Sequence, residues 1–215
     1  MKYLHLFGKF LISVGVGVLL FVAYTLWGTG YYYHQAQGRL EKEFAALPEF
    51  PDDPTDDVPP GPPKGWAPDP GDAVFRLHIP EIWDKPDIVV QGVGVDELQD
   101  GVGHYPNCRE GFERPLCTDF PETWPGQEAR VVISGHRTTY GAPFWDLNKL
   151  DLGDPIITET KWGRFVYRVT ETKIVEPDSQ VIVIPGTKAE IVLTTCNPRF
   201  SADERLVVFA ELETA

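Results

Sequence analysis

The sequence predicts an all-β domain of about eight short strands behind one N-terminal membrane helix. Three observations carry this prediction. Residues 10–33 contain no Asp, Glu, Lys, Arg or His, residues 48–72 are rich in Pro and acidic side chains, and residues 73–215 alternate short apolar runs with Gly, Pro and Asp. The last pattern is typical of a barrel or a sandwich.

The uncharged run is long enough to cross a membrane. At about 1.5 Å of rise per residue, a helix over residues 10–33 reaches roughly 36 Å, more than the hydrocarbon core of a bilayer. Trp27 and Tyr31–Tyr33 would form an aromatic belt at its end. Lys2 and Lys9 precede the run, which favours residues 1–9 in the cytoplasm and the rest outside the cell. A cleaved signal peptide would have a shorter apolar core and an A-x-A-like site, so a retained single-pass anchor is the better interpretation.

The segment after the anchor changes character twice. Residues 34–47 form a juxtamembrane segment, in which Gln35–Leu47 can be a short helix. Residues 48–72 hold nine Pro and seven Asp or Glu. Such a stretch buries too little apolar surface to offset its ordering entropy, so we expect a linker that acts as an extended, semi-stiff spacer.

Residues 73–215 form the folded domain. Two short runs read as helical turns, Val95–Gln99 and Pro143–Leu150. The expected strands are Val74–Ile79, Asp87–Gln91, Arg130–Ser134, Pro155–Thr160, Phe165–Ile174, Val181–Val183, Glu190–Thr195 and Arg205–Glu211.

Composition excludes several classes of function. The chain of 215 residues has a formal net charge of −13, so it lacks the basic surface that a nucleic-acid partner requires. Three cysteines are too few for a disulfide-stapled scaffold or a Cys₄ zinc site. His136, His104 and Cys196 lack the spacing of zinc ligands. We therefore expect no metal ion and no cofactor.

The three cysteines separate into a pair and a single thiol. Cys108 and Cys117 lie nine positions apart in one polar loop, and outside the cell such a pair most simply forms a disulfide. Cys196 remains without a partner. An odd cysteine in an exported domain is a reactive thiol, an intermolecular cross-link or a buried inert side chain.

Position in the chain favours the reactive thiol. Cys196 ends an expected strand just before Asn197-Pro198, where the chain must turn. If the next strand pairs with it as a hairpin, Arg205 returns beside Cys196, and His136 ends another strand. Imidazole can stabilise a thiolate and protonate a leaving amine, and guanidinium can stabilise an oxyanion. The trio therefore predicts acyl transfer through a thioester.

Two other classes remain open. One is a different exported cysteine enzyme acting on the cell wall, such as an L,D-transpeptidase or an amidase. The former typically has Gly before its cysteine, where this chain has Thr195, and the latter usually has Cys before His in the chain. The other is a non-catalytic, membrane-tethered β-domain in which Cys196 is inert.

Five segments carry a resemblance to a known family. Ser134–Gly141 (SGHRTTYG), Leu193–Pro198 (LTTCNP) and Glu204–Val208 (ERLVV) resemble the His, Cys and Arg blocks of sortases. The HRTTYG block and the Asn-Pro after the cysteine are most similar to class E sortases of actinobacteria. Gly103–Pro106 and Pro125–Gly126 also resemble strand-connecting segments of that family.

The resemblance implies a closed sortase β-barrel and a cysteine transpeptidase on the outer face of the membrane. Cys196 would form the thioacyl intermediate, His136 would act as general acid and base, and Arg205 would stabilise the oxyanion or hold the substrate backbone. The substrates would be surface proteins with an LAXTG-like sorting signal, cleaved after Thr.

The same resemblance extends to the acceptor and to the groove. The acceptor would be an amine of a peptidoglycan precursor, or a pilin lysine if the role is pilus assembly. Tyr105 would lie near the groove and help to select the residue after Leu in the signal. Apart from the resemblance, Thr194 and Thr195 are expected to line the same groove, although both are also ordinary strand residues.

Two features depart from the family pattern. Val192 stands where Thr is usual, which should change only packing or one hydroxyl contact. An insertion, Asn107–Trp124, carries Cys108 and Cys117 and borders the expected groove. We expect this insertion to alter substrate access, so it bears on the LAXTG assignment more than on the chemistry.

Overall fold

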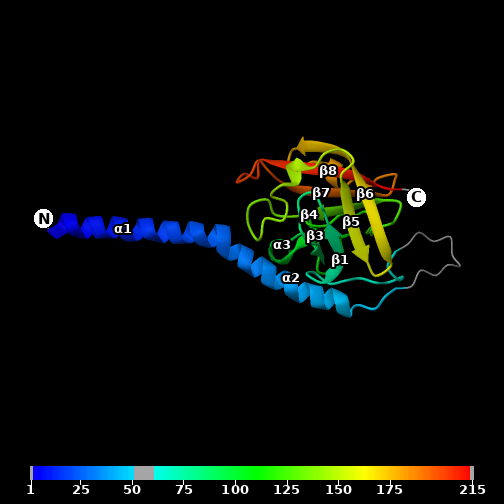
Figure 1. Ribbon diagram of the computed structural model, residues 1–215, viewed down its shortest axis with the longest axis horizontal. Coiled ribbons are helices and arrows are strands. Elements are labelled where there is room, and N and C mark those ends of the chain that lie inside the picture. Colours follow the sequence, from blue (N-terminus) through cyan, green and yellow to red (C-terminus); the bar gives the residue numbers. More distant parts are fainter. Residues whose placement is uncertain (1, 51–60, 214–215) are drawn as a thin grey trace.

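Eight strands close into a barrel in the computed structural model, which describes residues 2–50 and 61–213 (Figure 1). Around the barrel the strands follow the order β1-β2-β3-β4-β7-β8-β6-β5. Their bounds are β1 Ala73–His78, β2 Asp87–Gln91, β3 Val102–His104, β4 Arg130–Ser134, β5 Pro155–Thr160, β6 Gly163–Val175, β7 Glu190–Asn197 and β8 Glu204–Leu212.

Strand β7 occupies the position that organises the site. It pairs in parallel with β4 and antiparallel with β8, while β2 and β3 form the other parallel pair. Its apolar run Ile191–Leu193 is buried throughout, because both faces of the strand are covered. Leu193 packs in the barrel interior, and Val192 packs in a second cluster outside the barrel with Ile182 and Phe209. Burial on both faces fixes the position of the residues at the end of β7.

The expected all-β class and the closed barrel are confirmed, and seven of the eight expected strands coincide with strands of the structure. The expectation of a strand at Val181–Val183 is wrong, because Gln180–Ile182 is a 3₁₀-helix, η3. Strand β3 was not expected. The other short helices, α3 at Val95–Asp100 and the 3₁₀-helix η2 at Leu147–Lys149, lie within or near the two expected helical turns.

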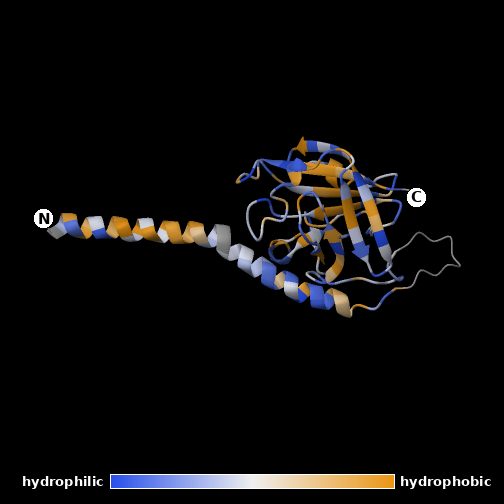
Figure 2. Ribbon diagram, in the orientation of Figure 1, coloured by the Kyte–Doolittle hydropathy of each residue, from blue (hydrophilic) through white to orange (hydrophobic). Residues whose placement is uncertain are grey.

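The N-terminal part is an almost continuous helical rod (Figure 1). Helix α1, Lys2–Ala23, passes through a π-helical turn, η1 at Tyr24–Gly28, into helix α2, Thr29–Ala46. Figure 2 shows α1 as mostly apolar and α2 as mostly polar. Tyr3–Ala23 is long and apolar enough to cross a membrane and is unburied, which makes it a candidate membrane anchor.

Helix α2 is docked on the barrel. Tyr33, Leu40 and Phe44 are buried in this contact. The Tyr33 hydroxyl donates a hydrogen bond to Asp87 Oδ2 at 2.7 Å, and the Gln37 side chain bonds both the amide and the carbonyl of Ile88. The expected anchor at residues 10–33 therefore overlaps by five residues, 29–33, with a helix that packs against the folded domain.

The described parts of the expected linker also lie on the barrel. The Phe50 amide donates to the Lys161 carbonyl at 2.8 Å. The Trp66 ring lies 4.7 Å from that of Trp124 and 5.8 Å from that of Trp162. Phe50 and Trp66 thus pack against aromatic rings of the folded domain, although the composition of residues 48–72 suggests no such apolar contact. The residues between them, 51–60, lie outside the described part of the chain.

Candidate active site

Three strand ends meet at one rim of the barrel. Cys196 on β7 and Arg205 on β8 are directly opposite each other in the antiparallel register. Ser134, at the end of β4, lies beside Thr194 in the parallel register, and the Gly135 amide donates to the Thr194 carbonyl at 3.1 Å. The next residue is His136. Cys196, His136 and Arg205 all line one cavity of about 740 Å³.

Cys196 is the free thiol, and its side chain is partly exposed at the cavity. Cys108 and Cys117 form a disulfide with a Cα–Cα distance of 4.9 Å. The expected separation into a structural pair and a single thiol therefore holds in the structure. A thiol that is accessible from an open cavity can act as a nucleophile.

The His136 imidazole is partly buried, and burial lowers its pKa below the ordinary value. Its ring centroid lies 5.1 Å from that of Tyr140. Nε2 has no hydrogen-bond partner among the described residues. A buried ring nitrogen without a partner, on a cavity wall that also holds a thiol, is suited to exchange a proton with a bound molecule.

The Arg205 guanidinium is held next to the end of its own hairpin. Nη1 donates to the carbonyl oxygens of Ala202 and Glu204, both at 3.0 Å. Both acceptors lie in or next to the β7–β8 turn. These bonds use one nitrogen of the planar fork, and the group carries a fixed positive charge on the cavity wall.

Arg137, the residue after His136, makes direct contacts with the end of β7. Its Nη1 donates to the Cys196 carbonyl at 3.2 Å and to Asn197 Oδ1 at 2.9 Å, and its Nη2 donates to Asn148 Oδ1 at 2.8 Å. The side chain is only 5% exposed. An arginine beside His136 in the sequence was the only available signal, because its burial depends on distant residues.

Thr194 and Thr195 line the cavity as expected, but both are buried. The Thr195 hydroxyl donates to the Gly135 carbonyl at 2.7 Å, which ties the strand carrying Cys196 to the segment between β4 and His136. The Thr194 hydroxyl has no partner among the described residues. Thr195 thus supports the site rather than offering its hydroxyl to a ligand.

The insertion Asn107–Trp124 supplies one wall of the cavity. Seven consecutive residues, 114–120, line it, and the disulfide lies within the same segment. The Tyr105 hydroxyl donates to the Pro115 carbonyl, so Tyr105 also belongs to this wall. The Cys108 amide donates to the Thr118 carbonyl at 2.7 Å, which closes the base of the loop.

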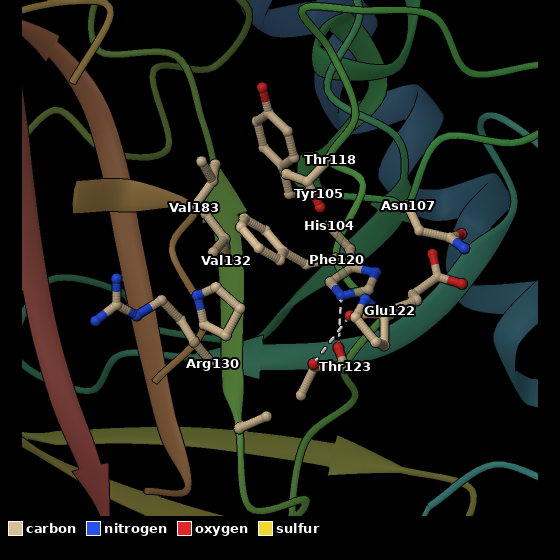
Figure 3. Close-up of a pocket in the computed structure, with 13 residues that line it drawn as sticks. His104, Tyr105, Asn107, Thr118, Phe120, Glu122, Thr123, Arg130, Val132 and Val183 are labelled. Carbon is tan, nitrogen blue, oxygen red and sulfur yellow. Dashed lines mark hydrogen bonds between the residues drawn. The ribbon is translucent and has the colours of Figure 1, made fainter. Parts of the chain in front are cut away.

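A smaller cavity of about 150 Å³ lies behind this wall (Figure 3). His104 is fully buried there, and its Nε2 donates to the Thr123 carbonyl at 2.9 Å. Its Nδ1 lies 2.9 Å from Gln91 Oε1, and Gln91 Nε2 donates a hydrogen bond to Glu122 Oε1. His104 therefore belongs to a buried polar network that joins the insertion to β2 and β3, and it does not line the larger cavity.

Comparisons with known proteins agree with this geometry. Residues 77–213 match the Sortase domain family. Sortase SrtE1 of Streptomyces coelicolor is 32% identical over 223 residues, covering 95% of this chain and 56% of the relative. The chain thus spans little more than half of that relative's length. Sortase SrtE2 of the same organism is 29% identical, covering 95% of this chain and 80% of the relative.

Solved structures lead to the same family. Sortase E1 of Streptomyces coelicolor, solved with a tripeptide in its active site, has a TM-score of 0.56 at 31% identity, covering 69% of this chain and 92% of that one. A Clostridium perfringens Sortase D5 transpeptidase has a TM-score of 0.59 at 19% identity, covering 86% of this chain and 99% of that one, which supports the fold alone. The resemblance to class E sortases is confirmed by these matches.

Proposed function

The chain belongs to the sortase family, and on that premise we propose that it is a membrane-anchored cysteine transpeptidase with Cys196 as its nucleophile. One observation carries the proposal: Cys196 and Arg205 are register partners at the cavity that His136 also lines. We assign His136 as the general acid and base and Arg205 as the group that stabilises the oxyanion or holds the substrate backbone.

The proposed reaction has two acyl-transfer steps. The Cys196 thiolate attacks the carbonyl carbon of Thr in an LAXTG-like signal, and the negative charge that develops on the oxygen lies within reach of a cation such as Arg205. The Thr–Gly C–N bond breaks, a thioester forms, and the protonated imidazole of His136 gives its proton to the leaving amine. An acceptor amine then attacks the thioester, which forms a new amide and releases the thiol.

The acceptor that we propose is an amine of a peptidoglycan precursor, with a pilin lysine as the alternative. We also propose that residues 1–9 lie in the cytoplasm and that the barrel lies outside the cell. The disulfide in the insertion supports this orientation, because disulfides persist in oxidising compartments.

The test uses the full chain in lipid vesicles, incubated with an LAXTG peptide and a small amine. Mass spectrometry should detect an acyl adduct on Cys196 and an amide-exchanged product. Cys196→Ala should abolish both, and His136→Ala and Arg205→Ala should each reduce kcat/KM by roughly two or more orders of magnitude. Arg164→Ala, at an exposed position that does not line the cavity, is the matched control and should retain activity.

The same proteins test the competing account, in which Cys196 is inert. If Cys196 were inert, iodoacetamide would label it only after unfolding. If another group were the nucleophile, cleavage would persist in Cys196→Ala. Either result would overturn the proposal.

A further inference from the structure

The rim that carries the candidate active site is the end of the barrel that faces α1. In Figure 1 the loop between β7 and β8 extends toward α1 farther than the rest of the barrel. This loop, residues 198–203, begins two residues after Cys196. The loop that follows His136 meets the helical rod at the same end, where the Tyr140 amide donates to Thr29 Oγ1 at 3.1 Å.

The contact at Thr29 sets the height of this rim above a membrane. The candidate span ends at Ala23, and Thr29 lies six residues beyond it. Six residues of helix rise about 9 Å. The polar headgroup layer on each side of a bilayer is about 5–8 Å thick. With the span inserted, the Thr29–Tyr140 contact therefore lies at the outer boundary of the headgroups, and side chains that extend from this rim reach into them.

The side chains at this rim are of the kind that lipid headgroups favour. Phe200 is 71% exposed at the tip of the β7–β8 loop, and Trp145 is 37% exposed with its ring 5.8 Å from that of Phe200. The Arg199 guanidinium lies 4.4 Å above the Trp145 ring and forms an ion pair with Asp146 at 3.0 Å. Aromatic rings paired with a cation are typical of membrane interfaces, where one end of the group is apolar and the other is hydrated.

We propose that Trp145, Arg199 and Phe200, here called the rim patch, contact the surface of the bilayer that holds α1. Tyr24, which directly follows the span, is a further exposed aromatic side chain. Because α1 and α2 already bring the barrel to the bilayer, the contact is intramolecular in effect and requires little affinity of its own.

Contact between the rim patch and the bilayer fixes the position of the cavity opening relative to the membrane surface. Phe200 is four residues from Cys196, so lipid bound at the rim patch places the thiol close to the headgroup layer. Molecules that reach Cys196 would then have to present their reacting group near the membrane surface. This inference concerns placement and does not depend on which reaction the site performs.

Spin-label depth measurement tests the proposal on the full chain. In a Cys196→Ala background, each new cysteine is the only free thiol, because Cys108 and Cys117 are in a disulfide. Nitroxides are placed by Phe200→Cys and Trp145→Cys. Arg164→Cys is the matched control, since its exposed side chain lies at the start of β6, beside the β5–β6 turn. The protein is reconstituted in vesicles of equal parts phosphatidylcholine and phosphatidylglycerol.

The quantity measured is the ratio of collision rates with oxygen, which partitions into lipid, and with a water-soluble nickel chelate. We expect this ratio to be several-fold higher at positions 200 and 145 than at position 164. Equal ratios at the three positions would overturn the proposal. Spin–spin broadening at position 200 would also overturn it, because the rim patch would then face a second copy of the chain. Cleavage by the parent enzyme is measured separately, so failure here leaves the proposed function untouched.

Discussion

Arg137 holds the end of β7 in place through the backbone rather than through the thiol. Its fork bonds the Cys196 carbonyl, the Asn197 side chain and the Asn148 side chain at once. A planar guanidinium can satisfy three acceptors in fixed directions, whereas an ammonium cannot reproduce this geometry. The residue is therefore a positioning residue for Cys196.

Arg137→Lys should lower kcat/KM for an LAXTG peptide by about 10- to 100-fold with a smaller change in KM, because a misplaced nucleophile loses orientation rather than binding. Steady-state kinetics over a range of pH measure this. Arg164→Lys makes the same chemical change at an exposed position and should retain the parent rate. Loss of activity that follows loss of thermal stability would show instead that Arg137 is merely structural.

His104 makes stability depend on pH. Burial lowers the pKa of His104 to about 4, below the ordinary 6.5 of an unfolded chain. The unfolded state therefore binds a proton more readily, so stability rises with pH between about 4 and 6.5 and falls as the solution is acidified through that range. A depression of this size corresponds to about 3 kcal/mol.

Urea unfolding at pH 7 and at pH 4.5 measures this loss of stability. In His104→Asn the difference in unfolding free energy between the two pH values should be smaller than in the parent. An unchanged difference would assign the acid sensitivity to another group whose pKa is lowered in the folded protein, such as Glu41 beside Arg76.

At the level of elements, the insertion Asn107–Trp124 forms one wall of the cavity, and a disulfide holds it in shape. Its disulfide closes the short loop 108–117, and residues 114–120 of the insertion line the cavity. The entropic benefit of a loop this short is about 2–3 kcal/mol, most of it local. The disulfide therefore affects mainly the shape of the cavity and contributes little to the stability of the barrel.

Cys108→Ser with Cys117→Ser should raise KM for the peptide and change the preference among signal variants, while kcat changes by less than about tenfold. Kinetics with LAXTG and LPXTG peptides measure both effects. If kcat falls as far as it does in His136→Ala, the wall is required for the chemistry itself.

The two elements that sequence reasoning misjudged have physical explanations. Strand β3 is three residues long and includes Gly103, where an added Cβ would lie 2.1 Å from the Gly92 carbonyl oxygen. So short a strand, with a glycine required by close backbone approach, gives no apolar alternation. Residues 181–183 are apolar because they pack on the outer cluster around Val192 and Phe209, and a closed barrel leaves no edge for a ninth strand.

The candidate site was more predictable than its surroundings. Cys196, Arg205 and His136 lie at strand ends, and the hairpin between β7 and β8 follows from two clear apolar runs. The contacts of Arg137 and the cavity wall around Leu116 depend on segments far apart in the sequence. Local periodicity carries no information about such contacts.

For the whole molecule, α2 is part of the folded domain rather than a tether. Tyr33, Leu40 and Phe44 are buried against the barrel, and Gln37 and Glu43 bond its backbone. The sequence suggested only a short helix here, because the polar residues on α2 hide the narrow apolar stripe that docks.

A chain that begins at residue 29 should therefore be more stable than one that begins at residue 48. The loss of three large buried side chains costs about 1.5–3 kcal/mol each in lost apolar burial. Thermal and urea unfolding of the two truncated chains measure the difference. Equal midpoints would mean that α2 binds the barrel too weakly to contribute.

The docking of α2 also has a consequence for biosynthesis. Its partners come late in the chain: Tyr33 needs Asp87, 54 positions on, and Thr29 needs Tyr140, 111 positions on. Helix α2 therefore leaves the ribosome well before its partners, and its apolar stripe stays uncovered until most of the barrel has been translated and has folded. With the barrel outside the cell, as proposed, the nascent protein would then present an exposed apolar surface beyond the bilayer, where extracytoplasmic folding factors could bind it.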